Sequence, residues 1–305
     1  MNVSEYPLLY RIKKQWLAYL FIAPALAILI IMHIYSMVFT IYISMTNFGI
    51  GGLSSFYNPR FVGFQNYVRI FSINIHTTLI LIGNSFLWAS SILILLGLSL
   101  GLASILNQDI KGKWIYRTIL LFPWAMPALI SLLVWGNMWN FTFGIINSII
   151  STFGFSPVNW IGHPTTAWIA LYITNIWLLL PFYTIIFLAA MQAIPKDLYE
   201  AAEIDGASSF YKFRRITISY IKPTIAFIGM TGFFFIFNNF YPVYFITFGG
   251  PGISTQIFVT YIYDELYNYS AFATSAVYTV VNFVILVVIG YLAIKYLKLT
   301  KGWLS

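Results

Sequence analysis

The sequence predicts an all-α integral membrane protein with six transmembrane helices. Three observations lead to this fold class. The composition is 60% hydrophobic and only 8% charged. The mean hydropathy of +0.83 lies far above that of an average soluble domain. The apolar runs are continuous over about twenty residues or more, the length that an α-helix needs to cross a bilayer, whereas strands of a membrane barrel would alternate apolar and polar residues.

The six apolar runs define the expected spans. They cover residues 17–39, 79–106, 118–139, 165–190, 224–246 and 273–296. The first run follows a basic start, as in a signal peptide, but it exceeds the roughly 7–15 residues of a signal-peptide core and no small-residue cleavage site follows. We therefore expect it to be retained. Prolines inside or beside the spans predict kinks; these are Pro24, Pro123, Pro127, Pro181 and Pro242.

The basic residues predict the orientation of the chain. Fourteen of the sixteen Lys and Arg residues fall in the two tails, in the second connection or in the central loop at residues 192–223. Only Arg60 and Arg69 fall in the other connections. The positive-inside rule then predicts that both termini and the central loop are cytoplasmic. The net charge of +8 is therefore spread along one membrane face, which argues against a nucleic-acid-binding groove.

The central loop at 192–223 is the one long polar segment, and its pattern predicts two short helices joined by a turn. Pro195 followed by acidic residues is typical of a helix start, and we expect this helix to run to about Ile204. Asp205-Gly206 is a turn dipeptide, and Ser208 or Ser209 can cap the next helix. A solvated loop helix would show the same charge pattern.

The residues of this loop resemble a known motif. Glu200-Ala201-Ala202, followed by Asp205-Gly206-Ala207 and later by Pro223, resembles the EAA loop of ABC-importer membrane subunits. In that family the loop is a coupling helix that docks into a cleft of a cytoplasmic ATPase subunit. The resemblance implies a type I ABC importer permease fold, with Glu200 paired to a basic residue of the ATPase. The ATPase-coupling residues that it implies are Tyr199, Glu200, Ala201, Ala202, Asp205 and Gly206.

Further segments resemble the carbohydrate-uptake branch of that family, in particular its F-type maltose-permease subunits. They are residues 61–67 (FVGFQNY), 113–127, 237–240 and 248–256 (FGGPGISTQ). With six spans and no large outer domain, the chain is similar to the shorter members. The fourth and fifth spans line the solute path in this family. The substrate-pathway residues that the resemblance implies are Asn175, Leu178, Leu179, Phe182, Gly232, Ile236 and Asn239.

The resemblance implies a sugar-importing permease of the cell membrane that works by alternating access. The implied partners are a second permease subunit, two ATPase subunits that bind ATP and Mg, an extracytoplasmic sugar-binding protein and membrane lipid. We expect no cofactor in this chain and no enzymatic site, because the sequence has no Walker A motif and its three histidines lack metal-ligand spacing.

A stand-alone ion-coupled secondary transporter is the alternative. Such carriers usually place ionisable groups inside the membrane, and here the span interiors hold essentially none. Sodium coupling through carbonyls and amides stays open, because several asparagines lie in the spans. A scaffold or channel subunit is a further alternative, and it predicts no ATPase partner.

Overall fold

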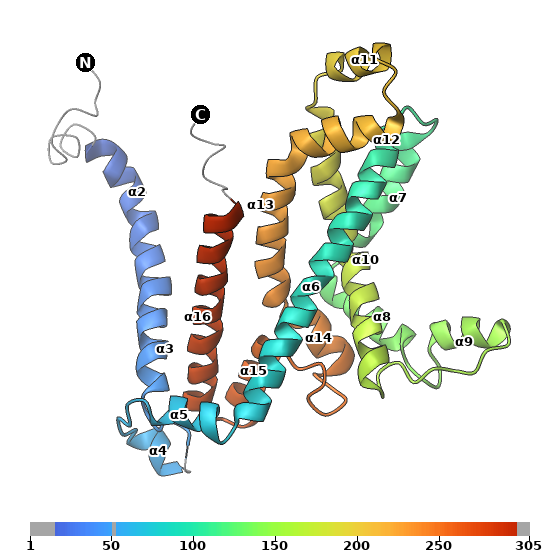
Figure 1. Cartoon of the computed structure of the whole chain (residues 1–305). Helices are drawn as coiled ribbons and strands as arrows, with labels where there is room; N and C mark the ends of the chain where they lie inside the picture. The colour runs from blue at the N-terminus through green and yellow to red at the C-terminus, as the bar shows by residue number, and fades with distance from the viewer. Residues whose placement is uncertain (1–15, 51–52, 298–305) are drawn as a thin grey trace.

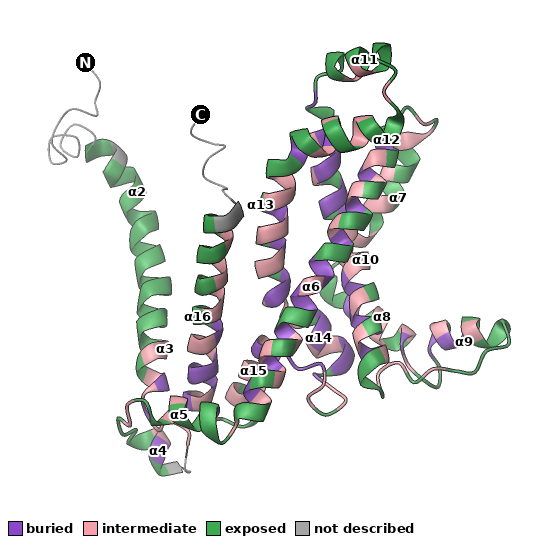
Figure 2. Ribbon diagram, in the orientation of Figure 1, coloured by how far each residue is buried: buried purple, intermediate pink, exposed green. Residues whose placement is uncertain are grey.

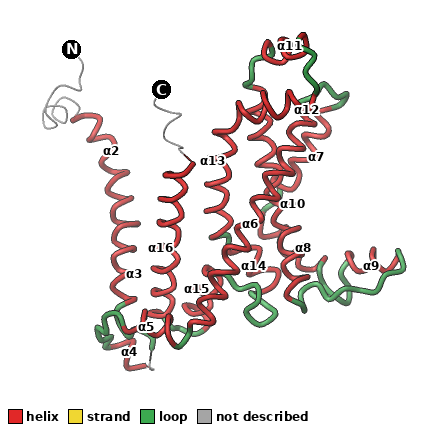
Figure 3. Tube along the Cα trace, viewed as in Figure 1, coloured by secondary structure: helices red, strands yellow, loops and turns green. Residues whose placement is uncertain are grey.

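The computed structural model describes residues 16–50 and 53–297, and regular secondary structure in these ranges is helical (Figure 3). The one β-bridge there is the isolated pair Thr46–Phe61. The basic tails that contributed to the predicted orientation lie largely outside the described residues.

Five helices are long and apolar enough to cross a membrane, and a sixth span exists if one bent pair is counted as a span. The five are α2 to α3 (Trp16–Leu29, the π-helical η2 at Ile30–Tyr35, and Ser36–Ser44), α6 (Ile75–Leu106), α10 (Pro164–Gln192), α12 to α13 (Ser209–Lys212, the π-helical η3 at Phe213–Thr217, and Ile218–Phe237) and α16 (Phe272–Leu297). The predicted all-α membrane fold is confirmed.

The third span differs from its prediction. A single helix was expected over 118–139, but α7 (Lys113–Ala125) and α8 (Ala128–Met138) meet at an angle of 91°. Met126 is extended, with φ −82° and ψ 141°, because a residue before proline is pushed out of the helical region. The break at Pro127 confirms one predicted kink. Pro24, Pro123 and Pro181 instead lie inside helices that continue past them.

The fifth span also differs. It was expected to run from 224 to 246, but α13 ends at Phe237 and α14 (Phe240–Thr247) follows as a separate helix. The interruption is the dipeptide Asn238-Asn239, which precedes Pro242. Asparagine amides can replace the backbone hydrogen bonds that a helix loses at such a break.

The short helices lie at the two ends of the bundle. Helices α4 (Leu53–Tyr57), α5 (Gln65–Ser72), α9 (Ile145–Thr152), α15 (Phe258–Tyr263) and the π-helical η4 (Asp264–Asn268) lie at or near one end, and α11 (Asp197–Ile204) lies at the other (Figure 1). The start of α2, the end of α16 and the α6–α7 connection share the end that holds α11. The basic central loop is therefore separated from Arg60 and Arg69 by the length of the bundle.

The core is built around α6 (Figure 2). One buried cluster includes Trp88 and Leu95 of α6 with Phe187 of α10, and a second includes Phe237, Phe258 and Tyr278. The described side chains of α2 are exposed, and its continuation α3 packs against α16. The first span thus leaves a long apolar surface for lipid or another membrane chain.

Candidate functional site

The central loop forms the predicted helix, turn and helix. Helix α11 is closed by Gly206, whose φ of +72° is left-handed. The backbone N–H of Ala207 donates to the carbonyl of Ala202 at 2.9 Å, and that of Gly206 donates to the carbonyl of Glu203 at 3.0 Å. These two bonds define a Schellman turn, which favours glycine because a Cβ strains the left-handed conformation. Ser208 then caps α12 by accepting from the N–H of Tyr211 at 3.3 Å.

Tyr199 fastens α11 to the base of α13. Its hydroxyl lies 2.8 Å from the hydroxyl of Thr217, which is buried. A second link is the ion pair between Glu203 of α11 and Lys212 of α12. Tyr199, which the resemblance names among the ATPase-coupling residues, therefore faces the bundle and positions α11.

The other implied coupling residues lie on α11 and on the turn that follows it. Glu200, Ala201, Asp205 and Gly206 are exposed, and Ala202 is half-buried. Among the described residues the ion pairs are Lys113–Asp109 and Lys212–Glu203, so the Glu200 carboxylate has no basic partner there. The same loop exposes large apolar side chains; they are Leu198, Ile204, Phe210 and Tyr211. Ile204 is 88% exposed.

A groove of about 500 Å³ lies between α7, α10 and α13. Three of the expected pathway residues line it, namely Leu179 and Phe182 of α10 and Gly232 of α13. A Cβ on Gly232 would lie 2.5 Å from the hydroxyl oxygen of Tyr183 and 2.6 Å from Cδ1 of Ile92. A larger residue here would have to displace Tyr183 or Ile92, because α13 packs closely against α10 and α6.

The other expected pathway residues do not line this groove. Ile236 is fully buried, and Leu178 is partly buried against the core. Asn175 is also fully buried; its Nδ2 donates to Oγ of Ser91 at 3.2 Å, and its Oδ1 accepts from Nδ2 of Asn239 at 3.4 Å. These amides connect α6 and α10 to the break between α13 and α14.

The resemblance did not identify most of the groove. The missed lining residues are Trp124, Tyr183, Ile186, Phe227, Ile228, Thr231 and Phe235. On α10 the expected pathway residues begin about one turn before the residues that line the groove. They start at Asn175, whereas the groove uses positions 179, 182, 183 and 186. Extending the same helical spacing along α10, and applying it to α13 from residue 227, would have found most of them.

The groove is suited to binding and carries no charged side chain. Its walls are aliphatic and aromatic, with Trp124 and Phe182 packed at a ring-centroid distance of 6.3 Å. The hydroxyl of Thr231 donates to the carbonyl of Phe227 at 2.9 Å, which leaves its oxygen able to accept a hydrogen bond. Within the described part of the chain, no group of His, Asp or Glu residues is arranged to hold a metal ion.

Comparison with known proteins identifies the family. Residues 67–298 match the model of the binding-protein-dependent transport system inner membrane component. The chain belongs to this family. It is a multi-pass protein of the cell membrane and the permease component of an ABC importer, not its ATPase. This membership does not support the alternative of a stand-alone secondary transporter.

Several similar proteins carry sugar-transport names. The chain is 36% identical over 287 residues to the trehalose/maltose transport system permease protein MalF of Thermococcus litoralis, covering 93% of this chain and 94% of that protein. It is 34% identical over 280 residues to the galactooligosaccharides permease protein GanP of Bacillus subtilis, covering 86% of this chain and 65% of GanP. It is 30% identical over 275 residues to the sulfoquinovosyl glycerol permease protein SmoG of Agrobacterium fabrum, covering 88% of this chain and 85% of SmoG.

The fold is shared with a solved importer. The crystal structure of a bacterial ABC transporter that imports alginate contains a chain that superposes with a TM-score of 0.82, at 23% identity, covering 95% of this chain and 98% of that one. At this identity the likeness establishes the fold.

Proposed function

We propose that the chain is the membrane permease subunit of an ATP-driven importer for a neutral sugar. Three relatives at 30–36% identity carry names of systems for sugars or a sugar glycerol. An uncharged groove with aromatic walls supports this, because aromatic faces pack on the C–H surfaces of sugars and a few polar groups fix the hydroxyls. Leu179, Phe182 and Gly232 then form part of one wall of the solute path.

The position of α13, which joins α11 to the groove, supports coupling between the ATPase and this path. The helix begins just after Thr217, whose hydroxyl is hydrogen-bonded to Tyr199 of α11, and it carries Gly232 in the groove. A movement of α11 is therefore transmitted along one helix to the groove. Asn175 and Asn239 hold the far end of that helix, and Ile236 and Leu178 pack behind the wall.

The partners follow from this arrangement. We infer that the end holding α11 is cytoplasmic, where Glu200, Ala201, Ala202, Asp205 and Gly206 contact an ATPase subunit, and that Glu200 pairs with a base of that subunit. Two such subunits bind ATP and Mg. A second permease covers the groove, and an extracytoplasmic binding protein delivers the sugar at the opposite end. A binding-protein complex of this kind has been solved for the alginate importer.

The mechanism that fits these contacts is alternating access. Closure of two ATPase subunits on ATP brings the α11 segments of two permease chains together, and the spans reorient to accept sugar from outside. Hydrolysis then restores the inward-facing state, in which the sugar is released.

Affinity purification from the native membrane tests the proposal. We expect a tagged chain to bring down an ATPase subunit and a second six-span chain, identified by mass spectrometry. Recovery of the chain alone, with solute movement in liposomes that does not need ATP, would refute the coupling role.

A further inference from the structure

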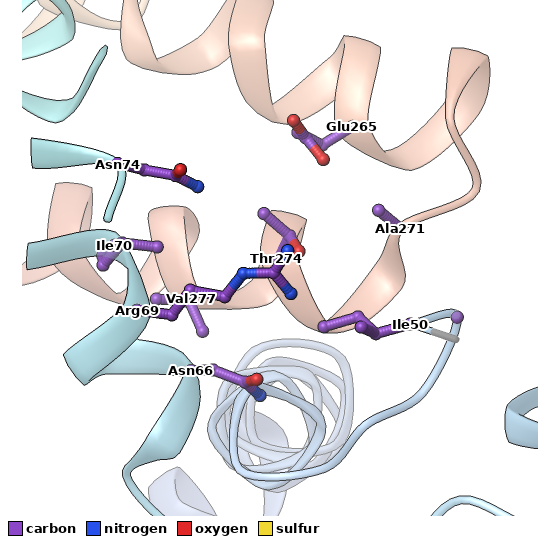
Figure 4. Close-up of a pocket in the computed structure, with 10 residues that line it drawn as sticks. Ile50, Asn66, Arg69, Ile70, Asn74, Glu265, Ala271, Thr274 and Val277 are labelled. Atoms are coloured by element: carbon purple, nitrogen blue, oxygen red, sulfur yellow. The ribbon is translucent and has the colours of Figure 1, made fainter. Parts of the chain in front are cut away.

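A polar cavity of about 310 Å³ lies at the end of the bundle opposite α11, between α5, η4, α16 and the residues that follow α3 (Figure 4). It lies apart from both the groove and the coupling loop. Its polar lining residues are Asn66, Arg69, Asn74, Glu265 and Thr274, and Ile50, Ile70 and Val277 are among the apolar ones.

Opposite charges face this cavity from two elements. Arg69 extends from α5, and Glu265 extends from η4 toward the same space (Figure 4). They are not within the 4.0 Å of an ion pair, since the pairs among the described residues are formed by other side chains. Burial raises the pKa of the Glu265 carboxyl, and the hydroxyl of Tyr261, which bonds to it, offsets this in part. A cation beside Glu265 would stabilise its charged form.

The cavity lies at the level expected for lipid headgroups. Helix α5 runs across the ends of the spans (Figure 1). Its Val68 is 64% exposed and its Phe71 is 49% exposed, while Ile70 is buried. A short amphipathic helix with an exposed apolar face lies at the boundary between headgroups and acyl chains. Arg69, on this helix, is therefore near the phosphate layer.

Asn66 adds an acceptor to these two charges. The Nδ2 of Asn66 donates to the carbonyls of Ser44 and Thr46 at 2.9 and 2.7 Å, so this side chain offers the cavity its carbonyl oxygen. The cavity thus combines a guanidinium for an anion with a carboxylate and an amide oxygen for a cation. Its charged groups sum to zero, which matches a ligand that carries both charges.

We propose that this cavity binds a phosphoethanolamine headgroup of a membrane lipid, with the phosphate on Arg69 and the primary ammonium on Glu265. Guanidinium groups recognise phosphate through two parallel hydrogen bonds. A primary ammonium has N–H groups that can donate to the Glu265 carboxylate and the Asn66 carbonyl, whereas a quaternary choline has none. Ile50 and Val277 line the wall that the glycerol end of the lipid would contact.

Lipid binding to the purified full-length chain, followed by native mass spectrometry, tests this site. The probes are short-chain phosphatidylethanolamine, phosphatidylcholine and phosphatidylglycerol. We expect the ethanolamine lipid to bind about tenfold or more tightly than the other two. Glu265→Gln should remove this preference, and Arg69→Gln should weaken binding of all three. Arg60→Gln is the matched control, because Arg60 is an exposed base of the same end outside the cavity and should leave binding unchanged.

Equal binding of the three lipids, or an unchanged preference in both Arg69→Gln and Glu265→Gln, would overturn the proposal. Free phosphoethanolamine is the second probe. If free phosphoethanolamine displaces the ethanolamine lipid at a concentration equal to that of the lipid, the cavity recognises phosphoethanolamine and its ligand is a soluble compound. If it does not compete, the source is the bilayer.

Discussion

The two chain breaks that flank the helix containing α13 differ in their surroundings. The helical path is interrupted before α12, at the turn that ends α11, and after α13, at Asn238-Asn239, while α12, η3 and α13 form one continuous helix. At the α11 end the chain turns through Gly206 with charged and apolar side chains exposed. At the other end, Asn238-Asn239 interrupts the path inside the bundle, where Asn239 bonds to Asn175 and Asn282 donates to Asn238 at 3.0 Å.

This difference follows from the solvent at each end. Water can satisfy polar groups at the α11 end, so the side chains there are free to bind another protein. In the membrane each polar group must find a partner within the protein. The buried amides are therefore fixed by the fold, while the exposed acids remain available for a partner. Substitutions at the two ends should fail in different ways.

The largest effect is expected for Glu200→Arg at the exposed end. If Glu200 pairs with a base of the ATPase, reversing its charge places two like charges in one docking site. Losing one partner of such a pair typically costs about 2–5 kcal/mol, which corresponds to a loss of roughly 30-fold or more in ATP-driven uptake and in ATPase recovered with the chain. The thermal unfolding midpoint of the isolated chain should not change.

Asp109→Arg is the control for that prediction. Asp109 is an acid at the same end of the bundle, and its pair with Lys113 is exposed. Water screens this exposed pair, so its loss should have little effect and uptake should be nearly normal. Equal loss of uptake in both variants would mean that the charge of this membrane face matters, not the docking of Glu200.

Asn175→Ala tests the buried end. It leaves the amide of Asn239 and the hydroxyl of Ser91 without this partner in the bundle. An unsatisfied buried polar group costs about 1–3 kcal/mol, so the unfolding midpoint in detergent should fall by several degrees. Asn137→Ala is the matched control, because Asn137 is exposed and bonds to Leu133 of its own helix. Similar midpoints for the two variants would contradict the role given to the Asn175–Asn239 contact.

Gly232→Ala tests the packing of α13 at the groove. The new Cβ would meet Tyr183 and Ile92 at under 3 Å. Overpacking of this kind costs about 1–3 kcal/mol, and because Gly232 and Tyr183 both line the groove, we expect uptake and the unfolding midpoint to fall together. Gly97→Ala on α6 meets nothing within 4 Å and should be neutral or stabilising. A Gly232→Ala variant as stable as Gly97→Ala would contradict the close packing.

The smallest effect is expected for Gly206→Ala. A Cβ at this exposed position meets open space, so the cost is the left-handed backbone alone, about 1 kcal/mol. That corresponds to roughly fivefold weaker recovery of the ATPase. Gly206→Asn should restore it, because asparagine tolerates this conformation. Weakening by both substitutions alike would indicate that the docking partner contacts Gly206 directly.

The sequence predicted the features that depend on local pattern. Apolar run length identified the membrane helices, and Asp205-Gly206 identified the turn that closes α11. It did not identify the ends of the third and fifth spans, because the apolar run continues across Pro127 and across Asn238-Asn239. Hydropathy measures solvent preference and carries no information on where a helix bends.

Long-range contacts were the second limit. The sequence pattern does not show that Asn175 is buried and bonded to Ser91, 84 residues earlier. Arg69 and Glu265 likewise meet at one cavity from distant parts of the chain. The groove involves the fourth and fifth spans, which the resemblance indicated, together with α7, and the packing of these three helices determines which residues line it.

Photo-crosslinking from α11 in the native membrane tests the central claim most directly. A photoreactive amino acid replaces Ala201, which is exposed on α11, or Tyr57, which is 87% exposed at the opposite end. We predict that position 201 forms an adduct with an ATP-hydrolysing subunit, identified by mass spectrometry, and that position 57 does not. Absence of that adduct at position 201, or its formation at position 57, would contradict the assignment of α11 as the coupling helix.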